Sequence, residues 1–252
     1  MIDWITPDWP APANINAMFT TRTIGMEAGE KGAYAGLNLA AHVGDDPHIV
    51  QANRDCLNQH LPASPLWLTQ IHGSRPIWID SDSETLEGDA AMSRHPEAVC
   101  AVLVADCLPV LLCDMAGSVV GAVHAGWRGL AEGIIENTVQ ALRECSYSDQ
   151  IIAWLGPAIS SRHFEVGEEV RTIFIEYDRQ AARAFIPGKE EGKWYADLFS
   201  LARQRLSHVG VSRISGGDLC TYSDPEKFYS YRRDGKTGRM AGLVWMTRSP
   251  DK

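Results

Sequence analysis

Residues 99–130, VCAVLVADCLPVLLCDMAGSVVGAVHAGWRGL, constrain the fold of this chain more than any other stretch. Three apolar runs, residues 99–105, 108–113 and 119–123, are rich in Val and Leu and too short for helices. They predict strands that are buried on both faces. Gly117 lies between the second and third runs and offers the positive φ that a tight hairpin turn needs. The stretch therefore predicts a buried β-hairpin.

This hairpin is expected to bring a cysteine and a histidine together. If Met115 and Ala116 form a two-residue turn, Cys107 faces His124 across the ladder, with Cβ atoms roughly 4.5–5.5 Å apart. A thiolate and an imidazole at that separation can share one metal ion. Pro109 cannot donate to the ladder, so the strand is expected to kink there or to lie at an edge of its sheet.

An ordinary structural role is the commoner one for each of these two residues. A cysteine in an apolar run is more often a small core residue than a ligand, and a histidine beside glycine and tryptophan is usually just hydrogen-bonded. Two features favour a site instead: Asp106 breaks the apolar run before Cys107, and a glycine-rich turn that carries Arg128 follows His124. Functional residues are often placed on such polar turns at strand ends.

Length and composition narrow the class of protein. The chain has 252 residues, enough for one large domain or two small ones, and its net charge of −9 argues against general nucleic-acid binding. None of the six cysteines forms a Cys-x-x-Cys pair, which favours a reducing compartment over a disulfide scaffold. The N-terminus has no signal-peptide pattern and no apolar run could span a bilayer, so we expect a cytoplasmic protein without a membrane partner.

Outside the hairpin, the chain predicts an alternation of strands and helices. Strands are expected over residues 14–22, 66–68, 76–79, 151–155, 164–166 and 209–214. Helices are expected from residue 46 or 47 to about 60 and over residues 130–143, 168–177 and 197–206. Residues 23–36 predict a glycine-rich loop, a candidate lid; residues 80–87 are acidic, and residues 85–93 predict a turn.

Two groups of arginines are candidate anion contacts. Arg128 lies at the N-terminal end of the helix expected over residues 130–143, and helix N-termini attract anions such as phosphate. A solvated arginine beside a helix is nevertheless the commoner situation. Further on, Asp234-Gly235-Lys236 predicts a hairpin turn between strands at residues 227–233 and 240–246. Arg232, Arg233 and Arg239 surround that turn, either on a charged surface loop or as a second anion contact.

His72, in the polar turn Gln70-Ile71-His72-Gly73, is the most natural third member of a metal site with Cys107 and His124. Two histidines and one cysteine with an open fourth position are the ligands of a catalytic zinc, and with a weak axial methionine they describe one type of copper centre. A metal-free alternative uses Cys107 as the nucleophile and His124 as the base of a cysteine hydrolase. A binding module without turnover is a third alternative.

Eight segments of the chain resemble the YfiH family, also called the laccase-domain or polyphenol-oxidase family. They follow the family's order along nearly the whole chain, and ADCLPV with HAGWRG is the most specific combination. The segments are FTTR (19–22), LNLAAHVGDDP (37–47), WLTQIHGS (67–74), ADCLPVLLCD (105–114), HAGWRGL (124–130), LGPAIS (155–160), CTYSD (220–224) and YSYRRDGKTGR (229–239).

The resemblance implies a single domain over residues 1–252 with a mixed α+β fold. Its core would be a β-sandwich flanked by helices, similar to the cytotoxic-necrotizing-factor-like fold. It also implies a metal, generally zinc, held by the residues that match the family's ligands: His72, Cys107 and His124. Together with their positions on polar turns, it makes Arg22, Asn38 and His42 weaker candidates for a substrate pocket in which Arg128 is the preferred anion contact.

The residues of this chain suit some of the family's reported activities better than others. They are phosphorolysis of adenosine, inosine, guanosine and methylthioadenosine, deamination of adenosine, copper-dependent polyphenol oxidation, and editing of peptidoglycan precursors. A multicopper laccase needs about ten histidines in His-x-His pairs, whereas this chain has eight and no such pair. Deamination needs a proton shuttle; Asp106 is the candidate, although a purely structural acid is about as common there. We therefore expect a zinc enzyme that takes a purine nucleoside and phosphate.

Overall fold

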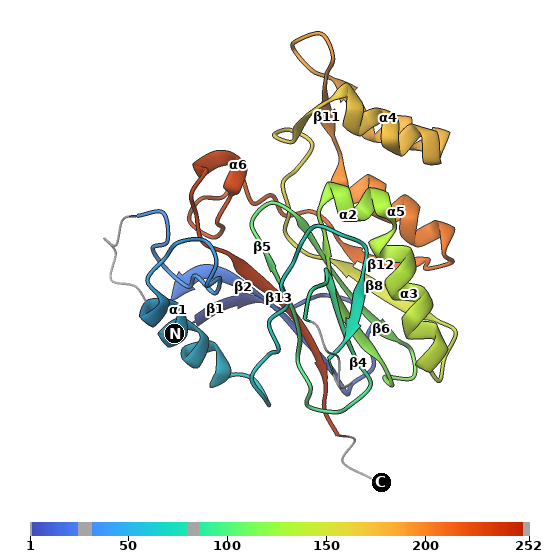
Figure 1. Ribbon diagram of the computed structural model, residues 1–252. Helices are drawn as coiled ribbons and strands as arrows, with labels where there is room; N and C mark the ends of the chain where they lie inside the picture. The colour runs from blue at the N-terminus through green and yellow to red at the C-terminus, as the bar shows by residue number, and fades with distance from the viewer. Residues whose placement is uncertain (1, 25–31, 80–85, 249–252) are drawn as a thin grey trace.

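The computed structural model describes residues 2–24, 32–79 and 86–248 (Figure 1). The candidate lid at residues 23–36 and the acidic stretch at residues 80–87 fall partly outside the described residues, so both interpretations stay predictions. Three β-sheets and the helices around them form a mixed α+β fold. Within the described ranges, no helix is long and apolar enough to cross a membrane.

The predicted hairpin forms the centre of a six-stranded sheet. Its strand order is β12(Arg213–Gly216), β8(Ile151–Leu155), β6(Leu108–Asp114), β7(Val120–Ala125), β4(Ala90–Ser93) and β3(Pro76–Trp78). The two outermost pairs are parallel and the inner pairs are antiparallel. Every residue of β6 and β7 is buried, as expected for strands covered on both faces.

A second, four-stranded antiparallel sheet packs against the first. Its order is β1(Ile2–Ile5), β2(Ile15–Ile24), β13(Met240–Met246) and β5(Cys100–Val104). One buried cluster joins the facing sides of the two sheets, with Phe19 and Val102 from one and Leu111 and Ala122 from the other. The core is therefore a β-sandwich, as the resemblance implied.

Helices cover the two outer faces of the sandwich, on opposite sides of the molecule (Figure 1). α1(Pro47–Asn58) lies on the four-stranded sheet, where Leu57 joins the cluster that includes Leu243. α3(Ile134–Cys145) and α5(Leu198–His208) cover the six-stranded sheet through the cluster that contains Val139 and Leu206. At one end, α4(Glu168–Tyr177) and a 3₁₀ helix at Arg179–Ala184 accompany a small sheet of β10(Phe185–Pro187), β11(Lys193–Ala196) and β9(Glu165–Gly167).

Local patterns correctly predicted several elements. α1 begins at Pro47, where the Asp46 side chain accepts a hydrogen bond from the backbone N–H of His48. α4 and β13 have the predicted bounds. The helix expected over residues 130–143 is instead two helices, α2(Trp127–Glu132) and α3, because Gly133 takes a left-handed conformation with φ +92°. A residue in this conformation ends one helix and lets the chain start the next in a new direction.

Three other local predictions are wrong. Residues 85–93 are not a turn throughout, because β4 continues the large sheet there. Residues 66–68 form no strand, and the neighbouring segment makes only an isolated bridge between Thr69 and Glu87. Residues 227–233 form no hairpin with β13: α6(Tyr231–Asp234) begins there with Ser230 as its N-cap, while β13 pairs with β2 and β5. Distant strands thus replace the local partner that the turn motif predicted.

Candidate metal centre and its pocket

The hairpin places Cys107, which directly precedes β6, near His124 of β7, but not directly opposite it. Pro109, not Cys107, faces His124 in the ladder, so the predicted pairing is wrong. Of the two alternatives for Pro109, the edge strand is wrong, because β6 lies between β7 and β8; the kink stays a prediction. Pro109 is tolerated there because the ladder with β8 begins only at the next residue, Val110.

The register shift originates in the turn. The pairing is centred between Ala116 and Gly117, one residue beyond the predicted centre. Gly117 has the predicted positive φ, at +64°. The buried carboxylate of Asp114 accepts hydrogen bonds from the backbone N–H groups of Ser118 and Val119, at 2.6 and 3.2 Å. These bonds close a longer loop than the two-residue turn assumed from the sequence.

The three predicted metal ligands nevertheless converge. Nε2 of His72 lies 3.9 Å from Sγ of Cys107, and the ring centroids of His72 and His124 are 4.8 Å apart. One ligand atom from each of the three residues lies within 4.8 Å of the other two. Because metal–nitrogen and metal–sulfur bonds are about 2.0–2.3 Å long, this set could hold one metal ion. We call these residues the His–Cys–His site.

The backbone on both sides of the site adopts an unusual conformation. His72 has φ +62° and Asp106, the residue before Cys107, has φ +89°. A side chain with a Cβ rarely occupies this left-handed region, which costs about 1–3 kcal/mol per residue. Such residues persist where surrounding contacts fix them, and they cluster at functional sites. Two of them flanking one cluster of ligands mark this end of the hairpin as a site.

A buried aspartate that the sequence interpretation missed lies behind the site. Asp89 accepts a hydrogen bond of 2.7 Å from Nδ1 of His124 and further bonds from the backbone of the His72 turn. Its position just before β4, in a segment interpreted as a turn, concealed it. One local signal was present: Asp89 is a charged residue at the start of a run of small buried residues.

The charges of the site stabilise one another. Burial acts to raise the pKa of the Cys107 thiol, but the neighbouring His124 and His72 outweigh it and lower the pKa to about 6. Burial acts to lower the pKa of His124, yet the Cys107 thiolate and the Asp89 carboxylate raise it to about 9. Without a metal, the pair is therefore a thiolate and an imidazolium near neutral pH, and a thiolate is the form of cysteine that binds metals.

The His–Cys–His site forms part of the wall of a cavity of about 500 Å³. Three arginines and three aromatic residues share the lining: Arg128, Arg232, Arg239, Trp127, Phe164 and Tyr231. His42, Gln70 and Asp106 also contribute. This volume is in the usual range of small-molecule sites, and a mixture of flat apolar rings and a few charged groups is typical of their walls.

Among the predicted anion contacts, Arg128 has a guanidinium that bonds to no other group in the described part of the chain. It is exposed and stacks over the ring of Trp127, with 4.6 Å from Cζ to the ring centroid. Among the described residues it has no hydrogen-bond or ion-pair partner. A guanidinium with five unused N–H groups at the edge of a cavity is well suited to bind an anion.

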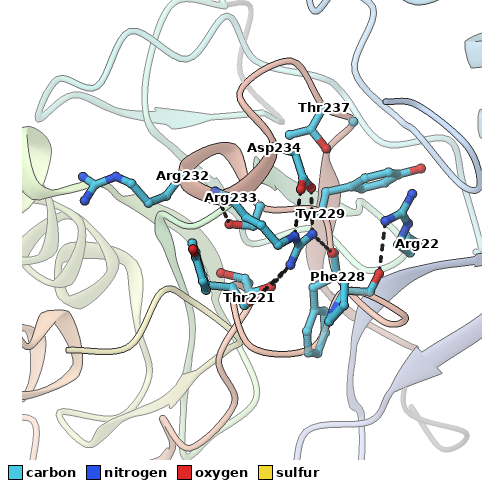
Figure 2. Close-up of polar contacts among 12 residues, drawn as sticks. Arg22, Thr221, Phe228, Tyr229, Arg232, Arg233, Asp234 and Thr237 are labelled. Atoms are coloured by element: carbon cyan, nitrogen blue, oxygen red, sulfur yellow. Dashed lines mark hydrogen bonds and ion pairs between the residues drawn. The ribbon is translucent and has the colours of Figure 1, made fainter. Parts of the chain in front are cut away.

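The C-terminal arginines divide between the pocket and the scaffold. Arg232 extends away from Arg233 (Figure 2) and reaches the pocket wall, while Arg239 reaches the same wall from the start of β13. Each also donates to a backbone carbonyl at 2.8 Å, Arg232 to that of Glu165 and Arg239 to that of Thr237. Arg233 is outside the lining and donates to the backbone carbonyls of Thr221 and Phe228, each at 2.9 Å. Arg232 and Arg239 therefore line the cavity, and their role as a second anion contact stays a prediction. Arg233 lies outside the lining and holds the C-terminal segment together.

Two of the predicted substrate contacts lie outside the cavity lining. Arg22 donates to the carbonyls of Ala35 and Pro225 and stacks on Tyr229, at the opposite end of the network in Figure 2 from Arg232. Asn38 is fully buried; its side-chain oxygen accepts a hydrogen bond from the backbone N–H of Arg239. His42 and Arg128, by contrast, do line the cavity.

Asp106, the candidate proton shuttle, lies at the cavity wall beside Cys107. Both of its oxygens already accept a hydrogen bond of 2.6 Å: one from the Thr221 hydroxyl and the other from the backbone N–H of Arg232. Asp106 thus ties the cysteine segment to the C-terminal arginines. This contact spans 126 residues of sequence and could not be read from the local pattern.

Fold and site together define a mixed α+β protein with a His–Cys–His site in a cationic pocket. Residues 16–247 match the family model described as multi-copper polyphenol oxidoreductase laccase. Purine nucleoside phosphorylases of Pseudomonas aeruginosa and Escherichia coli are each 47% identical to the chain, over 96% of it and 98% of their own length. The chain belongs to the YfiH family.

Solved structures agree with this assignment. A Neisseria meningitidis protein of 45% identity superposes with a TM-score of 0.89, covering 97% of this chain and 99% of its own. A YfiH protein of Bacillus licheniformis, 30% identical, gives a TM-score of 0.82 over 92% of this chain and 93% of its own.

Proposed function

We propose that this protein is a zinc-dependent purine nucleoside phosphorylase, with adenosine, inosine, guanosine and methylthioadenosine as its substrates. The observation that carries the proposal is the meeting of the His–Cys–His site with three arginines around one cavity of nucleoside size. The relatives named purine nucleoside phosphorylase support it, because they align with nearly the whole chain at up to 47% identity.

The donor set fits zinc. His72, Cys107 and His124 supply two imidazoles and a thiolate of lowered pKa, and Asp89 behind His124 forms the carboxylate–histidine pair common at zinc sites. Three protein ligands leave a fourth position open, as in catalytic zinc sites. When bound, zinc would act as a Lewis acid that polarises a substrate oxygen or nitrogen, or lowers the pKa of a water.

In phosphorolysis, the glycosidic C1′–N9 bond breaks as a phosphate oxygen bonds to C1′. The base leaves with the bonding electrons and takes up a proton, and ribose 1-phosphate is the second product. Little covalent help is needed at an oxocarbenium-like transition state, so positioning and electrostatics carry most of the catalysis. Arg128, with its free guanidinium, is our candidate for the main phosphate contact, and Arg232 and Arg239 add positive charge to the same wall.

The aromatic side chains are candidates for holding the purine. Trp127, Phe164 and Tyr231 present their rings to the cavity. A purine ring buries its flat apolar faces well against such rings, with an offset or edge-to-face arrangement. Arg22 and Asn38 would then act behind the pocket, because Asn38 fixes the backbone of Arg239.

Adenosine deamination is the secondary activity that we propose for the same pocket. Water replaces the C6 amino group, giving inosine and ammonia, and the reaction needs a group that moves a proton between them. Asp106 is our candidate for this group because it lies on the cavity wall. Each of its oxygens accepts one hydrogen bond and keeps a lone pair that can accept a proton.

The laccase description of the family model fits the donor set less well. A multicopper oxidase needs a trinuclear cluster in addition to its type 1 copper. In the part of the chain that the structure describes, one group of three or more His, Cys, Asp and Glu side chains is close enough to hold a metal. Copper in this single site remains an alternative to zinc, with weak phenol oxidation as its signature.

The deciding experiment incubates metal-quantified protein with adenosine, with and without phosphate, and separates adenine, inosine and ribose 1-phosphate. Phosphate-dependent adenine with equimolar ribose 1-phosphate supports phosphorolysis, and inosine in both reactions supports deamination. If neither product forms, the proposal fails, and a hydrolase that edits peptidoglycan precursors becomes the better hypothesis. Zinc-free protein that loses activity when Cys107 is alkylated would instead indicate the metal-free cysteine hydrolase.

A further inference from the structure

Asp89 accepts four hydrogen bonds, two on each oxygen of its carboxylate. Oδ1 accepts from the backbone N–H of His72 at 3.0 Å and from Nδ1 of His124 at 2.7 Å. Oδ2 accepts from the backbone N–H groups of Ile71 and Gly73, at 3.2 and 2.8 Å. The side chain is fully buried, with 0% exposure. Four donors match the acceptor capacity of one ionised carboxylate.

We propose that Asp89 is a positioning residue that sets both histidines of the His–Cys–His site at once. It acts on His124 through the side chain and on His72 through the backbone. The inference rests on the metal-binding part of the proposed function and is independent of which substrate is turned over.

On the His124 side, Asp89 determines which nitrogen faces the site. An ionised carboxylate only accepts hydrogen bonds, so Nδ1 of His124 must carry the proton. Nε2 is then the nitrogen left to serve as a metal ligand. The backbone N–H of His124 also donates to the carbonyl of Asp89 at 2.7 Å, which holds the two residues in fixed register.

On the His72 side, Asp89 holds a turn whose backbone is unfavourable by itself. Three successive N–H groups, from residues 71 to 73, converge on the carboxylate around the left-handed φ of His72. The start of the turn is fixed separately, because the side-chain amide of Gln70 exchanges two hydrogen bonds with the backbone of Leu103, at 2.7 and 2.9 Å. The His72 end therefore depends on Asp89.

An Asp89→Asn variant tests this arrangement with almost no change in shape. An amide has one acceptor oxygen and one NH₂ donor, so in either orientation the NH₂ group confronts two N–H donors. The turn or His124 must then move. The loss is specific to the carboxylate, since volume and burial are conserved.

Asp114→Asn is the matched control. Asp114 is also fully buried, and its carboxylate accepts from the backbone N–H groups of Ser118 and Val119 and from the hydroxyls of Ser118 and Ser146. It closes the turn at the other end of the same hairpin, without contact to the His–Cys–His site. A substitution there makes the same change from carboxylate to amide in a buried turn. Two of its partners are hydroxyls, which can accept as well as donate, so the amide can keep its hydrogen bonds there. The variant therefore tests the loss of a buried carboxylate away from the site.

The experiment measures zinc affinity by chelator competition in the two full-length variants and the unmodified protein, with circular dichroism to confirm folding. Loss of a partner behind a metal ligand typically weakens affinity 10- to 100-fold. We expect about that loss in Asp89→Asn and less than a twofold change in Asp114→Asn. Unchanged affinity in Asp89→Asn, or an equal loss in both variants, would overturn the proposal.

A second measurement keeps the proposal testable if Asp89→Asn does not fold. In the zinc-loaded, unmodified protein, the Nδ1 proton of His124 should give a downfield NMR signal protected from exchange, and Nε2 should carry none. A proton on Nε2 would overturn the proposal. If the unmodified protein binds no zinc, the proposed function fails. The role of Asp89 is then decided in the metal-free protein, by the proton on Nδ1 of His124 and by the protection of the backbone N–H groups of residues 71–73 from hydrogen exchange.

Discussion

Cys107 directly precedes strand β6 and Cys113 lies near the other end of that strand, and their neighbours give the two thiols different chemistry. Cys113 is fully buried, and burial with the adjacent Asp114 raises the pKa of its thiol far above the usual range. Cys107 lies only six residues earlier, where His124 and His72 lower the pKa to about 6. Burial beside a carboxylate keeps the Cys113 thiol protonated, whereas burial beside two imidazoles makes Cys107 a thiolate that could bind a metal ion.

The strongest test of this comparison removes each sulfur in turn. Cys107→Ala leaves two histidines, so we expect stoichiometric zinc to be lost and phosphorolysis to fall by at least about 100-fold, the upper range for loss of an outer partner. Cys113→Ala should keep zinc and activity and lose about 1 kcal/mol of stability through a small cavity. Metal content per chain, initial rates and urea unfolding measure the three quantities.

Either of two results would contradict that expectation. Zinc retained at full stoichiometry in Cys107→Ala would show that the sulfur is no ligand. Loss of activity in a well-folded Cys113→Ala variant would show that the two ends of the strand are not functionally separate.

Arg128 and Arg233 allow a similar comparison, between an arginine proposed to bind phosphate and one that stabilises the fold. Arg128→Ala removes a guanidinium that stacks on Trp127 and has no hydrogen-bond or ion-pair partner among the described residues, so stability should change by less than about 1 kcal/mol. Its loss should raise KM for phosphate about 10- to 100-fold, as expected for hydrogen bonds to a charged group. Arg233 bonds to backbone carbonyls, so Arg233→Ala should cost about 1–3 kcal/mol of stability.

The control for this pair is the phosphate dependence of Arg233→Ala. Below its melting temperature, this variant should keep KM for phosphate within a few-fold of the unmodified value. An unchanged KM in Arg128→Ala would transfer the phosphate contact to Arg232 or Arg239, the other arginines of the cavity wall.

The sequence predicted what local patterns encode. Short apolar runs identified the buried hairpin, a proline and an N-cap identified the start of α1, and three polar turns supplied His72, Cys107 and His124. The predicted hairpin pairing was wrong, because the loop that Asp114 closes is centred one residue later than the predicted turn. The three side chains still converge, because Cys107 and His124 lie at the same end of the hairpin and the His72 turn lies beside it.

Contacts between distant segments could not be predicted in this way. Asp89 meets His124 across 35 residues, and β13 pairs with β2 across more than 200. The spacing of apolar residues within a short segment does not predict contacts between segments so far apart. Arg22 was a candidate for the pocket because a polar turn and a family motif coincide there, yet its guanidinium is used on Ala35 and Pro225. A motif identifies a residue that matters, and only the fold shows what the residue contacts.

The pH dependence of alkylation sharpens the cysteine comparison. In metal-free protein, a thiol of pKa about 6 is about 90% thiolate at pH 7, against about 1% for a thiol of pKa 9. Its lower intrinsic nucleophilicity offsets most of this advantage, leaving a rate about fourfold higher. The rate at Cys107 should rise with pH through a midpoint near 6 and then level off, whereas Cys113 should react only after unfolding.

Mass spectrometry of the labelled peptides separates the two cysteines, and added zinc should protect Cys107. A midpoint near 9 at Cys107 would mean that the histidines do not stabilise its thiolate in solution. In that case, the charged pair described for the metal-free site would be incorrect.

The smallest expected effects come from two glycines that flank β7. An alanine at Gly126 has an allowed backbone, but its Cβ would lie 3.1 Å from both Sγ of Cys107 and Cδ2 of His72. A Cβ at Gly117 would lie 2.2 Å from Oδ1 of Asn14, at a left-handed φ of +64°. The first substitution therefore presses on the proposed metal ligands, whereas the second strains the turn and displaces the Asn14 side chain packed on it.

We expect Gly126→Ala to weaken zinc binding a few-fold while the free energy of unfolding of the metal-free protein changes little, because only ligand positions shift by tenths of an ångström. Gly117→Ala should leave zinc affinity intact and cost about 1–2 kcal/mol of stability, the usual penalty for a Cβ in left-handed backbone. Chelator competition and urea unfolding on both variants measure the two effects separately. If each glycine changed both quantities equally, the turn and the open end of the hairpin would form one energetic unit, and the division between a structural end and a functional end would not hold.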